Sequence, residues 1–361
     1  MKPLNQSAKL SYLAVALSLL CVSCQKDMRP SAGVENSPGS ISQQGLIFPI
    51  LIGWVRQADL PFGDLTPGDV PLGRYKMQSF AIGGKGYFCG GEASSTIWQT
   101  PIQEMKDLWE YDTLTHAWTQ KAGFPGPLVD DATSFVVGNK AYIVVNDETW
   151  QYDQATDTWT AKAKVPTRPR QDAISFAING KGYLGFGQVP NTTYEYYGDF
   201  WEYDPVADTW TQKASFKAGK RAYAAAFALS GKGYVCSGER LGAGGPPILN
   251  DLWEYDPVAN VWTAKADFPG PPRVAGIGLG GDALGRGYVL TGITNSPYLN
   301  DCWQYNPGTN TWAQFFSIGT QAEQQRGFAG GFVIGTHLYM GGGVGPIGSV
   351  GYHGYMDFWR L

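Results

Sequence analysis

Five arginines recur at one position of an internal repeat, six residues before a Phe or Leu. They are Arg74, Arg170, Arg221, Arg273 and Arg326. An acidic residue recurs two positions before the first of two tryptophans in every unit. These acids are Asp107, Glu148, Asp199, Asp251, Asp301 and Asp357. Because the planar guanidinium group binds carboxylates through two parallel hydrogen bonds, the pattern predicts either internal ion pairs or a site for an anionic ligand.

The two series of charges are expected at one end of the molecule, since the first and third strands of an up-and-down unit begin at the same face. In the functional interpretation, the arginines form an electropositive mouth that binds an anion such as a carboxylated sugar. In the structural interpretation, which we favour, each Arg pairs with a nearby acid and fixes the surrounding loops.

The second unit departs from this pattern, because Val129 stands in the place of the Arg. This unit keeps Glu148 and adds Asp130, Asp131 and Asp147. Carboxylate oxygens are the ligands of hard cations such as Ca²⁺, so the cluster could bind one. A solvated acidic loop is the favoured interpretation, and we assign no metal ligands and no cofactor.

The segments between the second and third predicted strands are long and differ between units, whereas the turns at the opposite face are short and uniform. Variable loops on a rigid scaffold often carry recognition, and exposed aromatic side chains make good contacts with sugars or proteins. The candidate ligand-binding residues of these loops are Trp98, Tyr196, Glu239, Arg240, Tyr298 and Tyr352. The alternative is that these side chains pack on neighbouring loops.

The elements that must position these residues form a repeat of roughly 50 residues. Five units contain a Trp followed nine residues later by a second Trp, and they start at Trp109, Trp150, Trp201, Trp253 and Trp303. Each unit predicts four short strands, the third containing a Trp-Glu-Tyr-Asp type segment. Near the end of the sequence Trp359 lacks its second Trp, and Trp54 supplies a matching one near the beginning. The two ends are therefore expected to complete a sixth unit together.

The glycine pairs such as Gly90-Gly91, the Tyr of the second strand and the Tyr-Asp…Trp segment resemble the kelch-repeat propeller family over residues 47–361. The resemblance implies an all-β, six-bladed propeller, because one unit is one four-stranded blade. Trp54 to Leu60 is then expected to form the outer strand of the last blade and to cover an edge that would otherwise be unpaired.

Some propellers of this family are enzymes, notably galactose oxidase and the bacterial N-acetylneuraminate epimerases. A copper site like that of galactose oxidase would need two His and two Tyr, and it is not expected in a chain with three His. An epimerase would need acidic or basic groups around a sugar in the central pocket, which Arg221, Glu239, Arg240 or Arg326 could supply. We assign no catalytic residue, since nothing in the spacing marks an acid or base.

Residues 1–23 resemble a bacterial lipoprotein signal. Lys2 and Lys9 precede the apolar stretch from Ser11 to Leu20, and Cys24 follows as the predicted site of lipidation. Residues 24–46 are rich in Pro, Ser and Gly and predict a flexible tether. An exported protein anchored by lipid to the outer membrane is expected. Gln25-Lys26-Asp27 resembles a signal for the cell surface in some Gram-negative lineages.

Charge and composition exclude some classes of partner. The formal net charge of -4 becomes -6 without residues 1–23, which contain two lysines and no acid, so nucleic acid is not an expected partner. Cys89, Cys236 and Cys302 are expected as buried thiols without disulfides. The sequence favours a non-catalytic cell-envelope module that binds a glycan or a protein through its long-loop face, with membrane contact only through the lipid. The alternative is a carbohydrate-active enzyme resembling N-acetylneuraminate epimerase.

Overall fold

The computed structural model describes residues 53–61, 73–94, 103–128, 131–190, 192, 195–240, 247–281, 283–295, 297–318, 324–347 and 351–361. The predicted signal segment, Cys24 and the tether lie outside these residues, as does the start of the folded region predicted at residue 47. All named elements are β-strands. Within the described ranges, the chain forms no apolar helix of sufficient length to cross a lipid bilayer.

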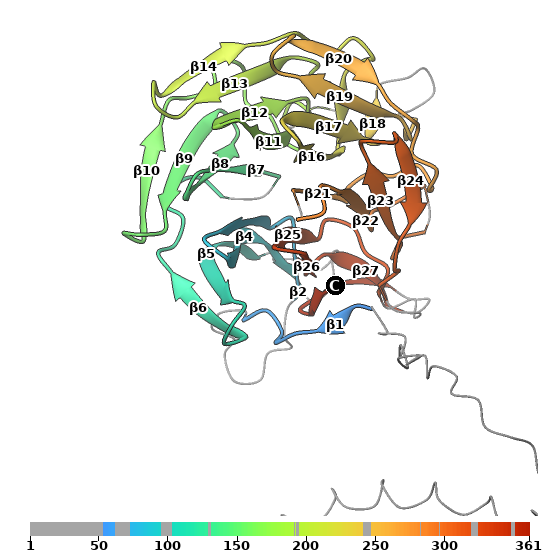
Figure 1. The fold of residues 1–361 in the computed structure, drawn as a ribbon. Helices are drawn as coiled ribbons and strands as arrows, with labels where there is room; N and C mark the ends of the chain where they lie inside the picture. The colour runs from blue at the N-terminus through green and yellow to red at the C-terminus, as the bar shows by residue number, and fades with distance from the viewer. Residues whose placement is uncertain are drawn as a thin grey trace, which may run out of the picture. The chain divides into compact units, whose positions relative to one another are not determined.

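Six four-stranded blades arranged around a central channel make up the fold (Figure 1). The innermost strands of blades one to six are β3 (Gln78–Ile82), β7 (Thr133–Val137), β11 (Ile174–Ile178), β16 (Ala225–Leu229), β21 (Ile277–Gly280) and β25 (Gly330–Ile334). The second strands are β4 (Lys85–Ser94), β8 (Lys140–Val145), β12 (Lys181–Gly185), β17 (Lys232–Cys236), β22 (Gly287–Leu290) and β26 (His337–Gly341). Each innermost strand contacts the next, and β25 contacts β3, so the six strands close a ring.

The third and fourth strands complete each blade as the Trp segments predict. The third strands are β5 (Gln103–Asp112), β9 (Glu148–Asp153), β13 (Phe200–Asp204), β19 (Leu252–Asp256), β23 (Cys302–Asn306) and β29 (Phe358–Arg360). The outer strands are β6 (Ala117–Lys121), β10 (Thr158–Lys162), β14 (Thr209–Gln212), β20 (Val261–Ala264), β24 (Thr311–Gln314) and β1 (Val55–Arg56). The prediction of six blades is therefore confirmed.

Turn chemistry explains why the first two strands of a blade form a hairpin. Asn179 and Gly180 join β11 to β12 with φ values of 49° and 78°. Two consecutive residues in the left-handed region define a type I′ turn, whose twist matches that of a two-residue hairpin. The innermost strand then alternates between buried and half-buried side chains, as a strand with one face against each neighbouring blade should.

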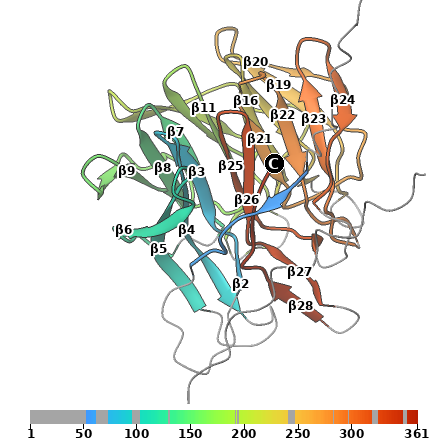
Figure 2. The same ribbon diagram turned by 60° about the horizontal axis from the view of Figure 1, so that its bottom comes forward.

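Short additional strands extend from the long-loop end of the blades. They are β2 (Gly73–Tyr75), which pairs with β4, the pair β15 (Arg221–Ala222) and β18 (Glu239–Arg240), and the pair β27 (Val344–Ile347) and β28 (Gly351–Gly354). Figure 2 shows β2, β27 and β28 projecting beyond the blades at this end. The loops there are thus partly ordered as strands.

Neighbouring blades interlock through a large ring on one side and a glycine on the other. A side chain on Gly182 would place its Cβ 2.1 Å from the ring of Phe135 in the preceding blade. Gly233 has the same relation to Phe176, with a distance of 2.2 Å. Because the aromatic ring occupies the space of the missing side chain, close packing between blades depends on these glycines.

The closure of the ring by the N-terminal strand is present in the structure. Val55 pairs with Arg360 and Arg56 with Trp359, so β1 adds antiparallel to β29, and the blue and red ends of the ribbon meet in Figure 1. Leu60 is buried with Phe358 in the cluster between the last blade and the first. Only two residues satisfy the definition of a strand here, fewer than the predicted Trp54 to Leu60.

The three described cysteines are free thiols, as expected. Cys89, Cys236 and Cys302 are buried. Burial raises the pKa of Cys236 to about 12, and it raises the pKa values of the other two thiols as well. Since the thiolate is the reactive form, these residues act as small apolar core residues.

Candidate functional site

The recurring arginines and aspartates form bidentate ion pairs, which the structural interpretation predicted. Arg170 Nη1 donates to Asp199 Oδ1 at 3.0 Å, and Nη2 donates to Oδ2 at 2.7 Å. The same pairing joins Arg74 to Asp107, Arg221 to Asp251, Arg273 to Asp301 and Arg326 to Asp357. Each aspartate also accepts a hydrogen bond from the indole of the Trp two residues later, as at Trp201 with a distance of 2.7 Å.

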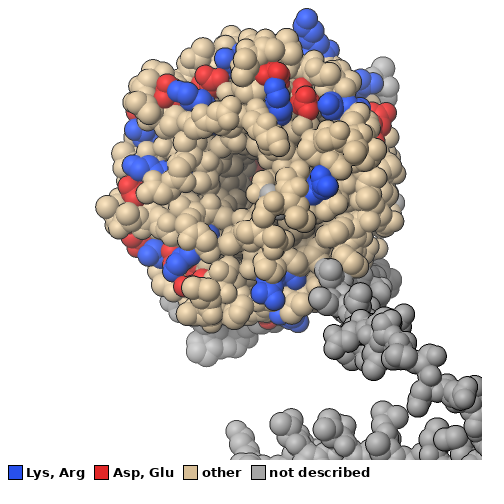
Figure 3. All heavy atoms as spheres, in the orientation of Figure 1, with Lys and Arg blue, Asp and Glu red and all other residues tan. Residues whose placement is uncertain are grey.

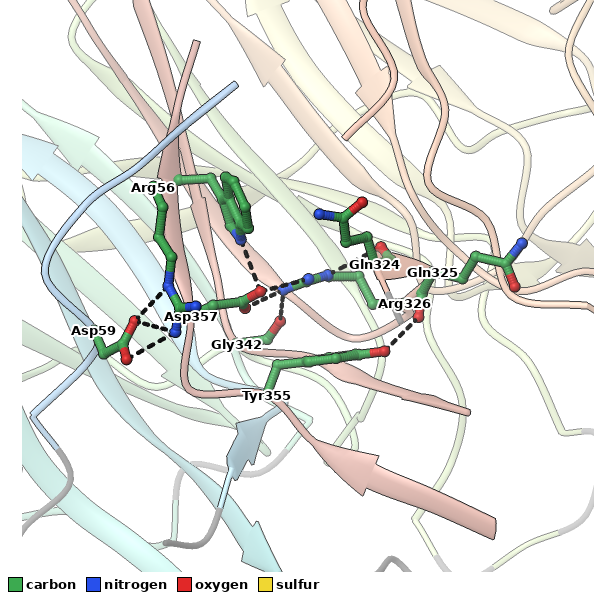
Figure 4. A network of polar contacts seen from close by, with 9 residues as sticks. Arg56, Asp59, Gln324, Gln325, Arg326, Gly342, Tyr355 and Asp357 are labelled. Atoms are coloured by element: carbon green, nitrogen blue, oxygen red, sulfur yellow. Dashed lines mark hydrogen bonds and ion pairs between the residues drawn. The ribbon is translucent and has the colours of Figure 1, made fainter. Parts of the chain in front are cut away.

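Arg326 shows how completely these guanidinium groups are used within the protein (Figure 4). Its Nη1 also donates to the carbonyl oxygen of Gly342 at 3.0 Å, and its guanidinium carbon lies 4.1 Å from the centre of the Tyr355 ring. Burial opposes ionisation of Asp357, yet the hydrogen bonds and charge of Arg326 hold the pKa of that carboxyl below its ordinary value. The pair is therefore charged.

All five arginines are buried, with relative exposures between 0% and 2%. Each has as partners its carboxylate and a backbone carbonyl oxygen, which belongs to Gly90 within β4 or, in the other four blades, to the residue just after the second strand, so little guanidinium surface is left for a ligand. Their geometry fits the role of fixing loops. None of the five guanidinium groups is exposed. The structure therefore gives no support to an electropositive mouth formed by Arg74, Arg170, Arg221, Arg273 and Arg326.

The residue two positions after each Arg forms the actual rim of the channel. In all six blades this residue has a left-handed backbone, with φ between 51° and 58°, and none of the six is a glycine. The six rim residues are Lys76, Asp131, Asp172, Tyr223, Ala275 and Phe328. Such a conformation costs about 1–3 kcal/mol for each residue with a side chain.

The strained rim is held by hydrogen bonds between the backbones of successive blades. The N–H of Tyr223 donates to the carbonyl of Asp172 at 3.2 Å, and the N–H of Ala275 donates to that of Tyr223 at 3.1 Å. Asp172 bonds to Asp131, Phe328 to Ala275 and Lys76 to Phe328 in the same way. The left-handed residue turns the chain from the buried Arg into the innermost strand, so the Arg precedes that strand instead of starting it.

Sequence reasoning named Asp131 only as part of the acidic cluster of the second unit and missed the other five rim residues, because the six share no chemical type. The signal that identifies them is position alone, two residues after the Arg or, in the second blade, after Val129. They line a cavity of about 150 Å³ at the long-loop end of the channel, together with Gln78 and Ala329. This is room for one small molecule or for part of a larger one, since pockets for drug-sized ligands have about 300–1,000 Å³.

Polar groups gather on one side of this mouth. Lys76 Nζ lies 2.9 Å from Glu92 Oε1 and 2.9 Å from Asp131 Oδ1. Gln188 Nε2 donates to Asp172 Oδ2 at 2.8 Å and to the hydroxyl oxygen of Tyr223 at 2.7 Å. Burial lowers the pKa of Lys76, but the charges of Asp131 and Glu92 and their hydrogen bonds raise it by more, so the net shift is upward and the ammonium stays charged.

Asp172 differs from the other carboxyls of the mouth. Burial raises its pKa well above the ordinary value, and the charge of Asp131 and a hydrogen bond with that carboxyl raise it further. A second carboxyl in contact makes ionisation of a buried carboxyl harder, because two like charges repel. Asp172 is therefore the carboxyl of the mouth whose protonated form is favoured most.

The other side of the mouth is apolar. The rings of Tyr223 and Phe328 meet edge to face, with their centres 6.1 Å apart and an angle of 83° between their planes. Met77, Ala275 and Ala329 complete this side of the cavity. The mouth thus combines an aromatic wall with hydrogen-bonding groups that point at the same space.

The opposite end of the channel has a different chemical character. A cavity of about 360 Å³ there is lined by uncharged residues that include Ser79, Ser134, Phe176, Gly278 and Val333. Figure 3 shows this end as a hollow in the centre of the molecule, with the Lys, Arg, Asp and Glu side chains around its outside. Charged groups therefore distinguish the long-loop mouth from the short-turn mouth.

The predicted loop residues have different positions in the structure. Tyr196 is buried, and its hydroxyl donates a hydrogen bond to Glu239. Burial raises the pKa of Tyr223 at the mouth, and the negative charge of Glu239 adds to that shift. Arg240 is exposed, and its backbone pairs with that of Arg221. Tyr298 is half-buried beside Gly327. Trp98 lies outside the described residues, and so does the side chain of Tyr352.

The acidic residues of the second blade do not gather at one point. Asp131 contacts Lys76 at the mouth, whereas Asp147 and Glu148 lie 3.5 and 3.3 Å from Lys164 Nζ on the surface. Asp130 lies outside the described residues. In the described part of the chain, no group of three or more His, Cys, Asp and Glu side chains is placed to hold a metal ion.

The raised pKa of Asp172 predicts how one substitution changes stability with pH. Between the unfolded value of about 4 and the raised folded value, the native state binds more protons than the unfolded state, so stability falls as pH rises. In Asp172→Asn the amide oxygen still accepts the hydrogen bond from Gln188. The free-energy cost of ionising a buried carboxyl disappears. We expect the melting temperature of the variant to equal that of the wild type near pH 4 and to exceed it by about 2–4 °C at pH 8.

Differential scanning calorimetry of both proteins from pH 4 to pH 9 measures this difference. Glu195→Gln is the matched control, because Glu195 is an exposed carboxyl of the same face that pairs with Arg168. The difference in melting temperature between Glu195→Gln and the wild type should not change with pH. A gain for Asp172→Asn at pH 4 that shrinks as pH rises would show that Asp172 is ionised throughout.

Comparisons with known proteins support the fold and nothing finer. No protein-family model matches the chain, and neither does any curated protein. The solved structure titled "Structure of YjhT" is similar in fold, with a TM-score of 0.65 and 16% sequence identity, and the match covers 84% of this chain and 95% of that one. At this identity the likeness shows only that both chains share the propeller architecture.

Proposed function

We propose that this chain is a cell-envelope binding module that recognises a glycan at the long-loop mouth of its propeller. The observation that supports the proposal is the mouth itself, where Tyr223 and Phe328 line a cavity together with Asp172, whose carboxyl accepts a hydrogen bond from Gln188. Sugars present apolar C–H faces beside hydroxyl groups. A wall of aromatic carbon next to fixed donors and acceptors is complementary to that pattern.

The rigidity of the rim favours binding at this place. Six left-handed residues linked from blade to blade hold their side chains in position before any ligand arrives. Fewer side chains then lose conformational freedom when the ligand binds, and this raises the affinity. The variable loops around the mouth would add the contacts that distinguish one glycan from another.

The proposal includes the finer assignments made from the sequence. The repeated glycine, Tyr and Trp pattern supports membership of the kelch-repeat family, and residues 1–23 with Cys24 support export and a lipid anchor in the outer membrane. Metabolic labelling with a palmitate analogue tests the anchor, since Cys24→Ala should abolish the label while the mature chain is still made. Label that persists in the Cys24→Ala protein would contradict it.

A glycan array followed by NMR titration of the hits tests the binding proposal. Tyr223→Ala removes half of the aromatic wall and is expected to weaken binding about tenfold, because an aromatic contact and its buried area contribute on the order of 1–2 kcal/mol. Arg168→Ala is the control at an exposed position of the same face. Equal affinity of Tyr223→Ala and wild type, or no glycan hit at all, would contradict glycan binding at the mouth.

The Asp131–Asp172 pair favours a second candidate, a carbohydrate-active enzyme. A carboxyl whose pKa is raised by burial and by a neighbouring carboxyl is a kind of group that general acid–base catalysis uses. NMR of the bound sugar separates the two candidates. An unchanged sugar supports a binding module, whereas anomer or epimer exchange faster than in buffer, and lost in Asp172→Asn, supports an enzyme.

A further inference from the structure

We infer that the mouth selects its sugar by charge, accepting neutral and amine-bearing sugars, preferring the latter, and rejecting carboxylated ones. This inference rests on the proposed function and names the class of ligand that the mouth takes. It is opposite to the anionic ligand that the ring of arginines suggested.

The charged groups of the mouth are mostly acidic. Among the described residues, Asp131 and Asp172 line the mouth, Glu92 pairs with Lys76 there, and the charge of Glu239 acts on Tyr223, whereas Lys76 is the cation beside them. Lys76 already has two carboxylate partners within 3 Å. A ligand carboxylate would therefore meet an excess of negative charge in a partly desolvated cavity, where repulsion is only weakly screened.

The arginines of the next layer do not change this balance. Each of the five is neutralised by its own aspartate through two hydrogen bonds, and the side chains are buried behind the rim. Arg240 is exposed, and it follows Glu239 in β18. The field in the cavity is thus set by the rim residues and their direct partners.

The mouth also shows how it accommodates an ammonium group. Lys76 Nζ lies between the carboxylates of Glu92 and Asp131 and 5.9 Å from the centre of the Phe328 ring. A ligand ammonium near Asp172 would find an equivalent environment across the cavity, with a carboxyl as acceptor and Tyr223 as the neighbouring aromatic ring. Carboxylates and aromatic faces are both favourable partners for such a cation.

Proton release provides a signature of this mode of binding. Asp172 is buried and faces Asp131, and both features raise its pKa well above the ordinary value and favour the protonated form in the free protein. A ligand ammonium stabilises the ionised carboxylate, so its binding should expel that proton, whereas a neutral sugar should leave it in place. Tyr223, Gln188 and Lys76 are the other groups that face Asp172, and none of them supplies a proton at neutral pH.

Isothermal titration calorimetry with D-glucosamine, D-glucose and D-glucuronate tests the inference on one pyranose ring with three charges. At about pH 6.5 we expect glucosamine to bind on the order of tenfold more tightly than glucose, since a hydrogen bond between charged groups is stronger than a neutral one. Glucuronate should bind more weakly than glucose. In two buffers of different ionisation enthalpy, only glucosamine should show proton release.

Two variants identify the groups responsible. Asp172→Asn should reduce the ratio of glucosamine to glucose affinity towards one and abolish proton release, and the ratio is the readout because the substitution also changes a group that contacts every sugar. Glu195→Gln likewise replaces a carboxyl by an amide, at an exposed position of this face, and it should preserve the tenfold ratio. The melting temperature of each variant confirms that it is folded.

The outcomes separate this inference from the proposed function. Binding of all three sugars with equal affinity, or tightest binding of glucuronate, would overturn charge selection while glycan binding stands. A preference for glucosamine that survives in Asp172→Asn would assign the selection to other groups and overturn the role of the mouth. No binding of any of the three would overturn both.

Discussion

Deletion of residues 47–61 is expected to abolish soluble expression of the propeller or to leave an aggregating product. This segment joins three blades. The N–H groups of Gln57 and Leu60 donate to Phe358 and Met356 of the last blade at 2.7 and 2.9 Å, and Trp54 Nε1 donates to Phe316 of the fifth at 3.0 Å.

The first blade is also connected through this segment. Trp118 Nε1 donates to the carbonyl of Ala58 at 3.2 Å, and Leu60 packs against Phe88 and Phe358 in one buried cluster. Loss of one buried Leu or Trp costs about 2–5 kcal/mol, and a folded domain has a net stability of about 5–15 kcal/mol. Deletion would also leave β29 with an unpaired edge, which promotes association between chains.

A deletion of equal length provides the control for this prediction. Residues 30–44 lie in the predicted tether, and their removal should leave expression, solubility and the melting temperature unchanged. Fractionation and size-exclusion chromatography of both deletions compare them directly. A soluble, monomeric and cooperatively melting product without residues 47–61 would refute closure of the ring by this segment.

Arg170→Ala is expected to lower the free energy of unfolding by about 3–5 kcal/mol, whereas Arg168→Ala should lower it by less than about 1 kcal/mol. The two arginines lie in the same blade and contact the same Tyr197 ring, at 4.5 and 5.7 Å. Their side chains are 1% and 62% exposed. Removal of Arg170 leaves the partly buried Asp199 without its bidentate partner, and it also opens a cavity.

Urea denaturation of both variants measures this difference. Because Arg170 faces Asp199 and not the cavity, affinity for a glycan hit should be the same in Arg170→Ala as in the wild type under conditions where the variant is folded. Equal stability of the two variants would show that the ion pairs contribute nothing measurable. Normal stability of Arg170→Ala with lost affinity would instead support the role of these arginines in binding an anion.

The sequence was sufficient to predict the blades because their signals are repeated and local. The paired tryptophans fix the third and fourth strands, and turn residues such as Asn179-Gly180 fix the hairpin between the first and second. Closure by Trp54 followed from the single missing partner. Each of these local signals is weak alone, but its recurrence from unit to unit was sufficient to assign the strands.

The site was harder to predict because exposure is not encoded in residue type. Arg221 fits both a buried ion pair and an open anion site, and only the three-dimensional path of the chain places Asp251 within 2.7–2.9 Å of it. The rim was not predicted for a different reason, which is that its residues share no chemical type. Lys76, Tyr223 and Phe328 have nothing in common but position, and their left-handed backbone is typical of glycine, so no residue preference marks the turn.

The contrast between the two layers explains how the propeller can carry a site at all. The Arg–Asp pairs fix the loops from behind, while the six residues of the strained rim in front present side chains of five types to one cavity. Strain of this kind persists only where surrounding structure over-determines it, and it is concentrated at functional positions. Substitution at the rim can therefore alter recognition without disturbing the blades.

A crystal structure of the protein with its strongest glycan hit tests the central claim most directly. The account predicts one sugar ring in the long-loop mouth, with its apolar face against Tyr223 and Phe328 and a polar atom within about 2.7–3.2 Å of Asp172 or Gln188. A sugar bound on the outer loops, or in the uncharged cavity beside Ser79 and Ser134 at the other end of the channel, would contradict it.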